Sequence, residues 1–389
     1  MKKNLGLYIS AKPHFGGLYQ YTQSIVTALS TLDQGTFEIT CFCSSRSWFE
    51  LLPARFNKIH VRNEFSTRIF SGLLKRMFPS ITIWRLAGRF SNIVKTINNS
   101  SCHIIIYPGQ DLASWQSKKP SIVAIHDLMH RYEPSYKEYN KVEYKKRELL
   151  YDGICKYAHL ILTDSELGKA HVIDSYNSNP NKIKVLPFTP PVYLLTSQII
   201  NVFKRYSLPK KYIFYPAQFW SHKNHVNLLK AVYLLKKDLK DIHLVLVGSK
   251  QNGYSDAIIA INNLELKNQV TILGYVPSEE MYSLYKSATA MVFVSVCGPT
   301  NIPPMEAFVT GCPLICSNTY AMPDQVGTAA LLINPRDPLD IAKQIKSIWN
   351  DEALQKKLIS AGFEQAKKYT QESFDRLFYA YITEALATI

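Results

Sequence analysis

Short apolar runs rich in β-branched residues alternate with longer helical patterns along almost the whole sequence. The first half begins with LGLYIS followed by GGLYQYTQSIVTALSTL, and the second half with YIFYPAQ followed by NHVNLLKAVYLLKKD. Strands that are joined through helices form parallel sheets, because each connection has to cross over a face of the sheet. The pattern therefore predicts an α/β protein with doubly wound sheets.

The length of 389 residues exceeds what one hydrophobic core usually organises, so we expect two domains. Near residues 189–208, the stretch TPPVYLLTSQIINVFKRYSLPKK combines prolines with a change of rhythm. We therefore expect one Rossmann-like domain over residues 1–190 and a second over 200–370. Residues 371–389 read as a further amphipathic helix.

Composition narrows the class of protein and its location. The opening MKKNLGLYIS lacks the pattern of a signal peptide, and no apolar run reaches the roughly 20 residues of a membrane span. The seven cysteines are scattered without metal-ligand spacing, so we expect buried, reduced thiols in a cytoplasmic protein. The net charge of +15 suggests an anionic partner, but no nucleic-acid-binding signature is present, and we expect no nucleic acid as a partner.

Basic residues gather in one apolar-rich segment, residues 61–100, which holds a single acid, Glu64. Such a segment suits the surface of an anionic membrane, with apolar side chains such as Phe70 and Leu74 between the charges. A solvated basic face over a packed apolar stripe explains the pattern equally well. The first interpretation predicts a peripheral protein on the inner face of the cytoplasmic membrane. The basic residues are Arg62, Arg68, Lys75, Arg76, Arg85, Arg89 and Lys95.

The stretch GPTNIPPMEAF, residues 298–308, lies between an apolar strand and a short helix. Pro303 and Pro304 fit a first helical turn, where backbone N–H groups have no intrahelical partner, and Thr300 or Asn301 can cap that turn. A helix N-terminus attracts anions such as phosphate. Glu306, expected near this N-terminus, can bind the vicinal hydroxyls of a ribose, or it can simply complement the helix dipole.

Other candidates follow strands, where doubly wound sheets bind their ligands. Gly16 and Gly17 would let the backbone approach a pyrophosphate, although paired glycines also form ordinary turns. Lys223 precedes a helix and can neutralise a diphosphate, unless it is a plain surface lysine. His126 closes the apolar strand SIVAIHD; it is either a site residue or a hydrogen-bonded core histidine.

Together these motifs resemble the retaining, nucleotide-sugar-dependent glycosyltransferases of family 4, also called glycosyl transferases group 1. The resemblance covers nearly the whole chain and is most specific over VTILGYVPSEEMYSLYKSATAMVFVSVCGPTNIPPMEAFVTGCPLICSN. It implies the GT-B fold, in which two Rossmann-like domains face a central cleft and the terminal helix crosses back to the N-terminal domain. The N-terminal domain would bind the acceptor and the second domain the nucleotide sugar.

The resemblance also implies roles for individual residues. The helix opening at Ile302 and Pro303 would support the donor phosphates, and Glu306 would hold the ribose. His126 would face the transferred sugar, and Lys223 would grip the diphosphate, so both are candidate catalytic residues. The remaining candidates for donor binding are Gly16, Gly17, Gln218, Gly274, Tyr275, Val276, Thr300 and Asn301.

Two positions depart from the family pattern. A second glutamate is expected eight residues before Glu306, where this chain has Gly298, and an arginine is expected where it has Gln218. The first change removes a carboxylate that contacts the donor sugar, and Thr300 and Asn301 are candidates to replace it. The second leaves more of the diphosphate charge to Lys223. Either change is compatible with an altered donor or with an inactive enzyme.

The expected reaction transfers a hexose or deoxyhexose, with retention, from a nucleoside diphosphate sugar to a lipid-linked or polysaccharide acceptor of a bacterial surface. No Asp-x-Asp motif occurs in the sequence, so we expect neither a metal nor a cofactor. Another GT-B enzyme, such as an epimerase or a phosphorylase, and a non-catalytic sugar-nucleotide-binding protein are the alternatives. The first would bring extra carboxylates or a much longer chain, and the second would fit Gly298 and the charge of +15.

Overall fold

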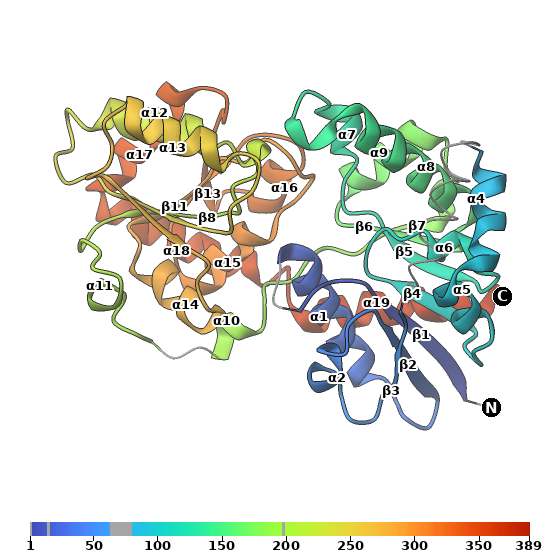
Figure 1. The fold of residues 1–389 in the computed structure, drawn as a ribbon. Coiled ribbons are helices and arrows are strands. Elements are labelled where there is room, and N and C mark those ends of the chain that lie inside the picture. The colour runs from blue at the N-terminus through green and yellow to red at the C-terminus, as the bar shows by residue number, and fades with distance from the viewer. Residues whose placement is uncertain (1, 14–15, 63–79, 197–198) are drawn as a thin grey trace. The chain divides into compact units, whose positions relative to one another are not determined.

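The computed structural model of the chain describes residues 2–13, 16–62, 80–196 and 199–389. They form two compact units, which we call unit 1 and unit 2 (Figure 1). Unit 1 comprises residues up to 128 together with 141–188 and 371–389, and unit 2 comprises 129–140 and 189–370. The chain therefore passes from one unit to the other four times.

Unit 1 is built on a seven-stranded parallel sheet with the order β3-β2-β1-β4-β5-β6-β7. The direction of winding changes between β1 and β4, which are neighbours although β2 and β3 come between them in sequence. The strands are β1 Lys3–Ile9, β2 Phe37–Cys43, β3 Asn57–His60, β4 Ile104–Tyr107, β5 Ser121–Ala124, β6 Leu160–Thr163 and β7 Ile183–Val185.

Both faces of this sheet are buried because successive side chains of a strand point to opposite sides. Leu7 and Ile9 of β1 lie in one apolar cluster with residues of α1 and α19, whereas Tyr8 lies in a second cluster with residues of α5 and α8. The α-helices of unit 1 are α1 Gly16–Thr31, α2 Trp48–Leu51, α4 Ile81–Ala87, α5 Asn92–Asn98, α6 Ala113–Gln116, α8 Lys141–Tyr157, α9 Glu166–Tyr176 and α19 Gln371–Ala387; single 3₁₀ turns are η1 Gly88–Phe90 and η3 Pro180–Lys182.

The last helix, α19, completes unit 1. Its Gln371 side chain donates to the main-chain oxygen of Ser24 in α1 over 3.0 Å, and the rings of Phe374 and Tyr21 meet edge to face. Farther along, the Tyr381 hydroxyl donates to the main-chain oxygen of Val185 over 2.9 Å. The prediction that the terminal helix crosses back to the N-terminal part of the chain is therefore confirmed.

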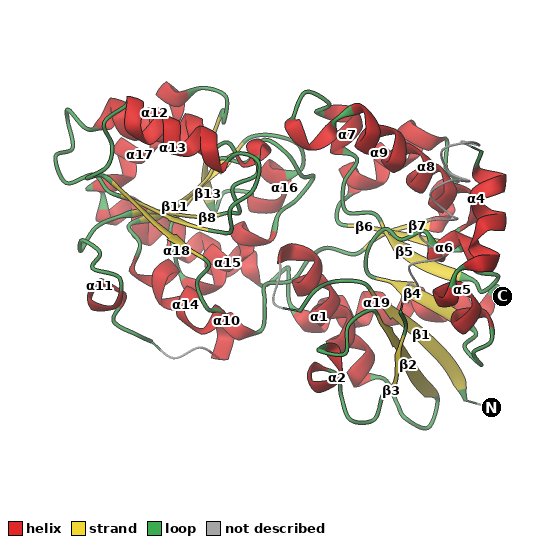
Figure 2. Ribbon diagram, viewed as in Figure 1, coloured by secondary structure: helices red, strands yellow, loops and turns green. Residues whose placement is uncertain are grey.

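Unit 2 has a six-stranded parallel sheet with the order β10-β9-β8-β11-β12-β13. Helices α12, α13 and α17 cover one face, and α14, α15 and α18 cover the other (Figures 1 and 2). The strands are β8 Ile213–Pro216, β9 Leu244–Val247, β10 Val270–Gly274, β11 Ala290–Phe293, β12 Leu314–Ser317 and β13 Ala330–Ile333. The helices are α10 Tyr193–Thr196, α11 Val202–Arg205, α12 His225–Leu235, α13 Tyr254–Asn263, α14 Ser278–Ser287, α15 Ile302–Thr310, α16 Met322–Val326, α17 Pro338–Trp349 and α18 Glu352–Ala366, with the 3₁₀ turn η4 Ser221–Lys223.

The segment 129–140 differs from the sequence interpretation, which assigned it to the N-terminal domain. It contains α7 Met129–Tyr132 and the 3₁₀ turn η2 Lys137–Tyr139, and it belongs to unit 2. Met129 and Tyr139 form a small apolar cluster with Val296 and Cys297 of unit 2. No periodicity in the sequence reports such a contact, because its two sides are far apart along the chain.

The structure bears on other expectations as well. The α/β fold with two Rossmann-like parallel sheets is confirmed. All seven cysteines are buried, as expected for core thiols. No helix in the described ranges is long and apolar enough to cross a membrane. Three of the seven basic residues of the segment 61–100, namely Arg68, Lys75 and Arg76, fall in 63–79, outside the described residues.

Candidate active site

The sheet of unit 2 brings two of the predicted site residues together at its switch point. β8 has β9 on one side and β11 on the other, so the connections after β8 and β11 lead to opposite faces. Ligands of such sheets bind in the crevice that opens there, beyond the carboxyl ends of the strands. Lys223 follows β8, and Asn301 follows β11.

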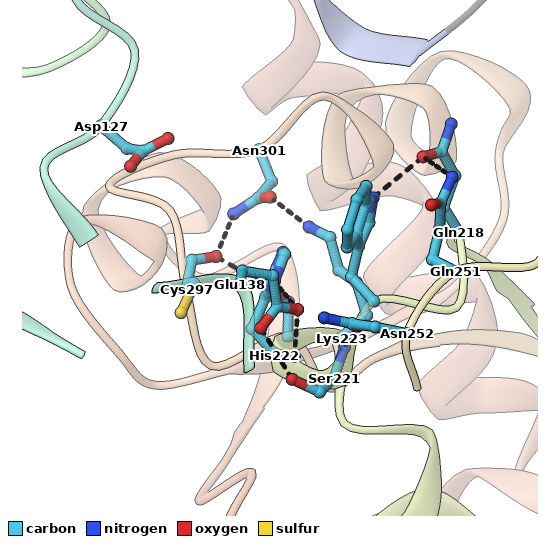
Figure 3. Close-up of polar contacts among 12 residues, drawn as sticks. Asp127, Glu138, Gln218, Ser221, His222, Lys223, Gln251, Asn252, Cys297 and Asn301 are labelled. Atoms are coloured by element: carbon cyan, nitrogen blue, oxygen red, sulfur yellow. Dashed lines mark hydrogen bonds and ion pairs between the residues drawn. The ribbon is translucent and has the colours of Figure 1, made fainter. Parts of the chain in front are cut away.

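Lys223 is held at this point by its side chain and by its main chain. Its Nζ donates to Oδ1 of Asn301 over 3.1 Å and lies 5.2 Å from the centre of the Phe293 ring (Figure 3). Its main-chain oxygen accepts a 2.6 Å hydrogen bond from the Tyr215 hydroxyl. The cation is therefore fixed next to the N-terminus of α15, where the helix dipole adds positive potential.

The N-terminus of α15 differs from the expected one in its capping. Asn301 is the N-cap residue, but its side chain makes no capping hydrogen bond, because it accepts from Lys223 instead. Its own N–H donates to Oε1 of Gln325 over 3.0 Å. The N–H groups of a first helical turn have no acceptor within the helix. Because Pro303 and Pro304 have no N–H, Ile302 is the residue of this turn that can offer such a group to a ligand. This terminus therefore offers an anion mainly its dipole.

Glu306 was expected near the helix mouth, and this placement is wrong. It is the fifth residue of α15 and only 7% exposed. Its Oε1 accepts a 3.4 Å hydrogen bond from the Tyr193 hydroxyl, and its Oε2 accepts one from the Tyr285 hydroxyl. Burial raises the pKa of Glu306 to about 7, although the hydrogen bonds from Tyr285 and Tyr193 act in the opposite direction. A buried carboxyl group that accepts two hydrogen bonds does more than complement the helix dipole.

Gln218 stands where the family pattern has an arginine, and it forms hydrogen bonds with two neutral side chains. Its Oε1 accepts hydrogen bonds from Trp220 Nε1 over 3.0 Å and from Gln251 Nε2 over 3.5 Å (Figure 3). Among these three side chains no charge faces the loop after β8. The amide is thus part of a polar network that keeps the start of this loop in place.

The end of β10 supplies three further candidates. Gly274 has φ +71°, a conformation that suits glycine, and open space surrounds the position a Cβ would take. Tyr275 is 63% exposed, whereas Val276 is buried. This strand end therefore combines an accessible aromatic ring with an unobstructed stretch of backbone.

The candidates in unit 1 follow β1 and β5. Gly16, with φ +73°, and Gly17 open α1, and both are exposed. His126 is partly exposed; its Nε2 donates to the main-chain oxygen of Pro108 over 2.8 Å, and its ring meets those of Tyr21 and Phe188. Burial lowers its pKa, against the effect of the hydrogen bond to Pro108. His126 is therefore a neutral imidazole with Nδ1 as its acceptor.

Several polar partners at these sites had no signal in the sequence. Tyr193 and Tyr285 hold Glu306, Gln325 holds Asn301, and Glu138 contacts the turn that carries Lys223. Their partners lie between 21 and 113 positions away along the chain. Within the described residues, no group of three or more His, Cys, Asp or Glu side chains is arranged to hold a metal ion.

Comparison with known proteins supplies the family. The sequence model described as "Glycosyl transferases group 1" matches residues 199–365, which include Lys223, Gln218 and the whole of α15. Residues 199–365 thus carry the sequence pattern of the group 1 glycosyltransferases. That assignment favours sugar transfer over the epimerase, phosphorylase and non-catalytic alternatives.

Two of the curated relatives are named as mannosyltransferases of O-antigen chains. O-antigen chain mannosyltransferase B of Escherichia coli is 26% identical over 274 residues, which is 69% of this chain and 71% of that protein. O-antigen chain mannosyltransferase RfbU of Salmonella typhimurium is 27% identical over 227 residues, 58% of this chain and 60% of that protein. The serotype-specific mannosyltransferase WbdA of Escherichia coli is matched over only 32% of its length, at 22% identity.

Solved structures confirm the GT-B fold over the whole chain. Sucrose-phosphate synthase from Thermosynechococcus elongatus has a TM-score of 0.77 at 17% identity, covering 100% of both chains. HepE from Anabaena, in complex with UDP and glucose, has a TM-score of 0.72 at 16% identity, also covering 100% of both chains. At such identities the likeness concerns the fold of the glycosyltransferase and not its substrates.

Gly298 now has a physical explanation. Its φ is +102°, and a Cβ there would lie 2.9 Å from Nδ2 of Asn301 and 3.2 Å from the main-chain oxygen of Thr300. The loop conformation that places Asn301 beside Lys223 is therefore one that a glutamate at position 298 would strain. Thr300, partly buried, lies in the same loop.

Restoring the family's glutamate by Gly298→Glu should impair the glycosyltransferase. We expect a loss of about 1–3 kcal/mol in the free energy of unfolding, the usual cost of a side chain in a conformation reserved for glycine. The measurement is chemical denaturation, beside turnover of the donor. Gly298→Ala is the matched control, since it adds the Cβ without the carboxylate. If Gly298→Glu were more active than the wild type while Gly298→Ala was impaired, the loop would be accommodating the carboxylate.

The raised pKa of Glu306 makes stability depend on pH. Below its ordinary value of 4.5 the carboxyl is protonated in both the folded and unfolded states; above it, the unfolded chain ionises first, so stability falls until the pH passes about 7. Glu306→Gln should remove this loss. Relative to wild type, the variant should gain about 3 kcal/mol between pH 4.5 and 7.5, since each pKa unit corresponds to ~1.4 kcal/mol.

Urea denaturation across that pH range measures the effect. The exposed Glu352 provides the control, because Glu352→Gln changes the same chemistry without burial. An equal pH dependence in wild type and Glu306→Gln would contradict the raised pKa.

Proposed function

We propose that the chain is a retaining, metal-independent mannosyltransferase that uses a nucleoside diphosphate sugar and acts on a growing bacterial surface polysaccharide. Mannose is proposed because the named relatives in Escherichia coli and Salmonella typhimurium are mannosyltransferases of O-antigen chains. A nucleotide donor is proposed because a protein of the same fold, HepE, binds UDP-glucose. The polysaccharide acceptor rests on the same relatives.

The observation that carries the proposal is the position of Lys223. Its ammonium group lies 3.1 Å from Oδ1 of the residue that precedes α15, at the switch point of the unit 2 sheet. A cation and a helix dipole thus converge where this fold binds ligands. A departing nucleoside diphosphate carries the negative charge that such a site stabilises.

In the proposed reaction, the bond between the anomeric carbon and the diphosphate oxygen breaks while the acceptor hydroxyl adds on the same face of the sugar. The departing phosphate oxygen accepts the hydroxyl proton, so no protein nucleophile is needed. Lys223 stabilises the charge that develops on the diphosphate, and Asn301 holds the lysine until the donor arrives. Because Gln218 is neutral, this stabilisation falls largely on Lys223.

Other site residues have proposed roles in donor binding. Glu306, kept in place by Tyr193 and Tyr285, is proposed to accept from the ribose hydroxyls, for which its oxygens retain lone pairs. Tyr275 and the backbone at Gly274 are proposed to lie along the base. In unit 1, Gly16 and Gly17 remain candidates for the pyrophosphate and His126 for the sugar.

The direct test is release of nucleoside diphosphate from a panel of sugar nucleotides that includes GDP-mannose and UDP-glucose, with and without an excess of chelator. We expect release to require an acceptor and to persist in chelator. Lys223→Ala should lower kcat about 100- to 1,000-fold, the usual effect of removing one group that stabilises transition-state charge. Lys211→Ala is the matched control, because Lys211 precedes β8 and so lies at the opposite edge of the sheet.

The possible results separate the parts of this proposal. No release from any donor would reject the activity, and a strict need for Mg²⁺ or Mn²⁺ would reject the metal-independent mechanism. Equal turnover by Lys223→Ala and Lys211→Ala would remove Lys223 from the site. A product of inverted configuration, read by NMR of the new linkage, would reject retention.

We propose further that the basic segment 61–100 binds an anionic membrane, which would present a lipid-linked acceptor. In its described part, Leu86 and Phe90 are 48% and 52% exposed. Arg85 is less available than its charge suggests, because its guanidinium lies 4.0 Å from the centre of the Tyr157 ring. Arg62, Arg89 and Lys95 are exposed, whereas Arg68, Lys75 and Arg76 lie outside the described residues.

Replacing Arg68, Lys75 and Arg76 together by glutamine should reduce sedimentation with anionic liposomes about 100-fold, because each basic residue near such a surface contributes ~1 kcal/mol. The control replaces Lys343, Lys346 and Lys356 of unit 2 in the same way. Raising the salt concentration should weaken binding of the wild type. Unchanged sedimentation of the first variant, at wild-type thermal stability, would contradict the membrane contact.

A further inference from the structure

Glu138, in the segment 129–140, grips the turn that carries Lys223. Its Oε2 accepts a 2.7 Å hydrogen bond from the Ser221 hydroxyl, and its Oε1 accepts from Nδ1 of His222 over 2.9 Å and from the His222 N–H over 3.3 Å (Figure 3). Both oxygens of one carboxylate are thus used on two consecutive residues. Those residues, with Lys223, make up the whole of η4.

The contact is largely shielded from solvent. The Glu138 side chain is 8% exposed and that of His222 is 16% exposed. Burial opposes the charged form of Glu138, but the hydrogen bonds from His222 and Ser221 more than offset this and lower its pKa to about 2. A carboxylate that stays ionised under such burial depends on those donors, and the donors depend equally on it.

The main chain of the turn has partners other than Glu138, and the His222 ring also meets those of Trp220 and Tyr136. The Ser221 N–H donates to Oδ1 of Asn252 over 3.0 Å, and the His222 main-chain oxygen accepts from the Val296 N–H over 3.0 Å. These bonds fix where the turn begins and how it meets the chain after β11. The hydrogen bonds to Glu138 hold the side chains of Ser221 and His222, the two residues of the turn that precede Lys223.

Other anchors hold the segment 129–140 without touching the turn. Glu133 accepts from the Tyr320 hydroxyl over 2.9 Å and forms an ion pair with Arg336, and Lys137 pairs with Asp256 at 2.7 Å. Met129 and Tyr139 add apolar contacts. The segment therefore has enough attachment to stay docked when Glu138 is altered.

We propose that Glu138 is a positioning residue for the transfer reaction: by clamping Ser221 and His222 it orients η4 so that the Lys223 ammonium group meets the donor diphosphate. This inference rests on the proposed function, because it acts through Lys223. It adds a residue from the N-terminal half of the sequence to the donor site. It also explains how the site tolerates a buried carboxylate close to an anionic ligand, since that charge is committed to Ser221 and His222.

The test is Glu138→Gln, which keeps the size but leaves one acceptor oxygen for three donors. We expect kcat with the best donor of the panel to fall about 10- to 100-fold, the scale of a misplaced catalytic group, with a smaller change in KM. The matched control is Glu133→Gln, the same substitution in the same segment, which should leave kcat within about twofold of wild type. Equal losses in both variants would mean that Glu138 serves docking of the segment alone.

A double-mutant cycle with Lys223→Ala distinguishes positioning from general support. If Glu138 acts through Lys223, Glu138→Gln should have little further effect once Lys223 is alanine, whereas independent effects multiply. Multiplying effects would overturn the proposal. Wild-type kcat in Glu138→Gln would overturn it as well.

A readout that does not need turnover keeps this test separate from that of the proposed function. Amide hydrogen exchange of peptides spanning 220–224 should quicken about tenfold or more in Glu138→Gln and stay unchanged in Glu133→Gln, because the His222 N–H loses its acceptor. If the wild type releases no nucleoside diphosphate, the proposed activity fails. Hydrogen exchange and the affinity for UDP and GDP, compared between wild type and Glu138→Gln, then decide whether Glu138 positions the turn. If neither changes, the positioning role of Glu138 is rejected.

Discussion

The parallel pairing of β8 with β11 is the interaction on which the donor-side site depends. Their register places Ile213 opposite Ala290 and Phe214 opposite Met291, so both strands end at the same edge of the sheet. The chain then continues in opposite directions, to η4 from β8 and to α15 from β11. Lys223 and Asn301 are 78 positions apart in sequence, and this pairing brings the loops that carry them to the same edge of the sheet.

The fold and the location of the site could be predicted because both follow from short-range patterns. The alternation of apolar strand-like runs with helical patterns predicted the two sheets. The rule that ligands bind at the ends of strands selected Lys223, Asn301 and Gly274. The capping of α15 and the surroundings of Glu306 could not be predicted. Propensities describe which side chain can cap a helix, but a lysine from another loop competes for Asn301. Burial raises the pKa of Glu306, and the hydrogen bonds from Tyr285 and Tyr193 oppose it.

The two departures from the family pattern have different physical characters. The effect of Gly298 is on the backbone conformation: with φ +102° it shapes the loop that presents Asn301. The effect of Gln218 is on side-chain interactions, since a charged arginine is replaced by an amide that forms hydrogen bonds with Trp220 and Gln251. The first is tied to the geometry of the loop, whereas the second shifts the electrostatic demand to Lys223 without altering the fold.

The four passages of the chain between the units have a consequence for synthesis on the ribosome. Gln371 bonds Ser24 across 347 positions, so unit 1 lacks a helix of its core until its last residues have been made. Unit 2, in turn, incorporates residues 129–140, which emerge well before its first strand. Domains commonly fold one after the other as they leave the ribosome. Here the apolar face of α1 that packs against α19 stays uncovered until α19 has been made.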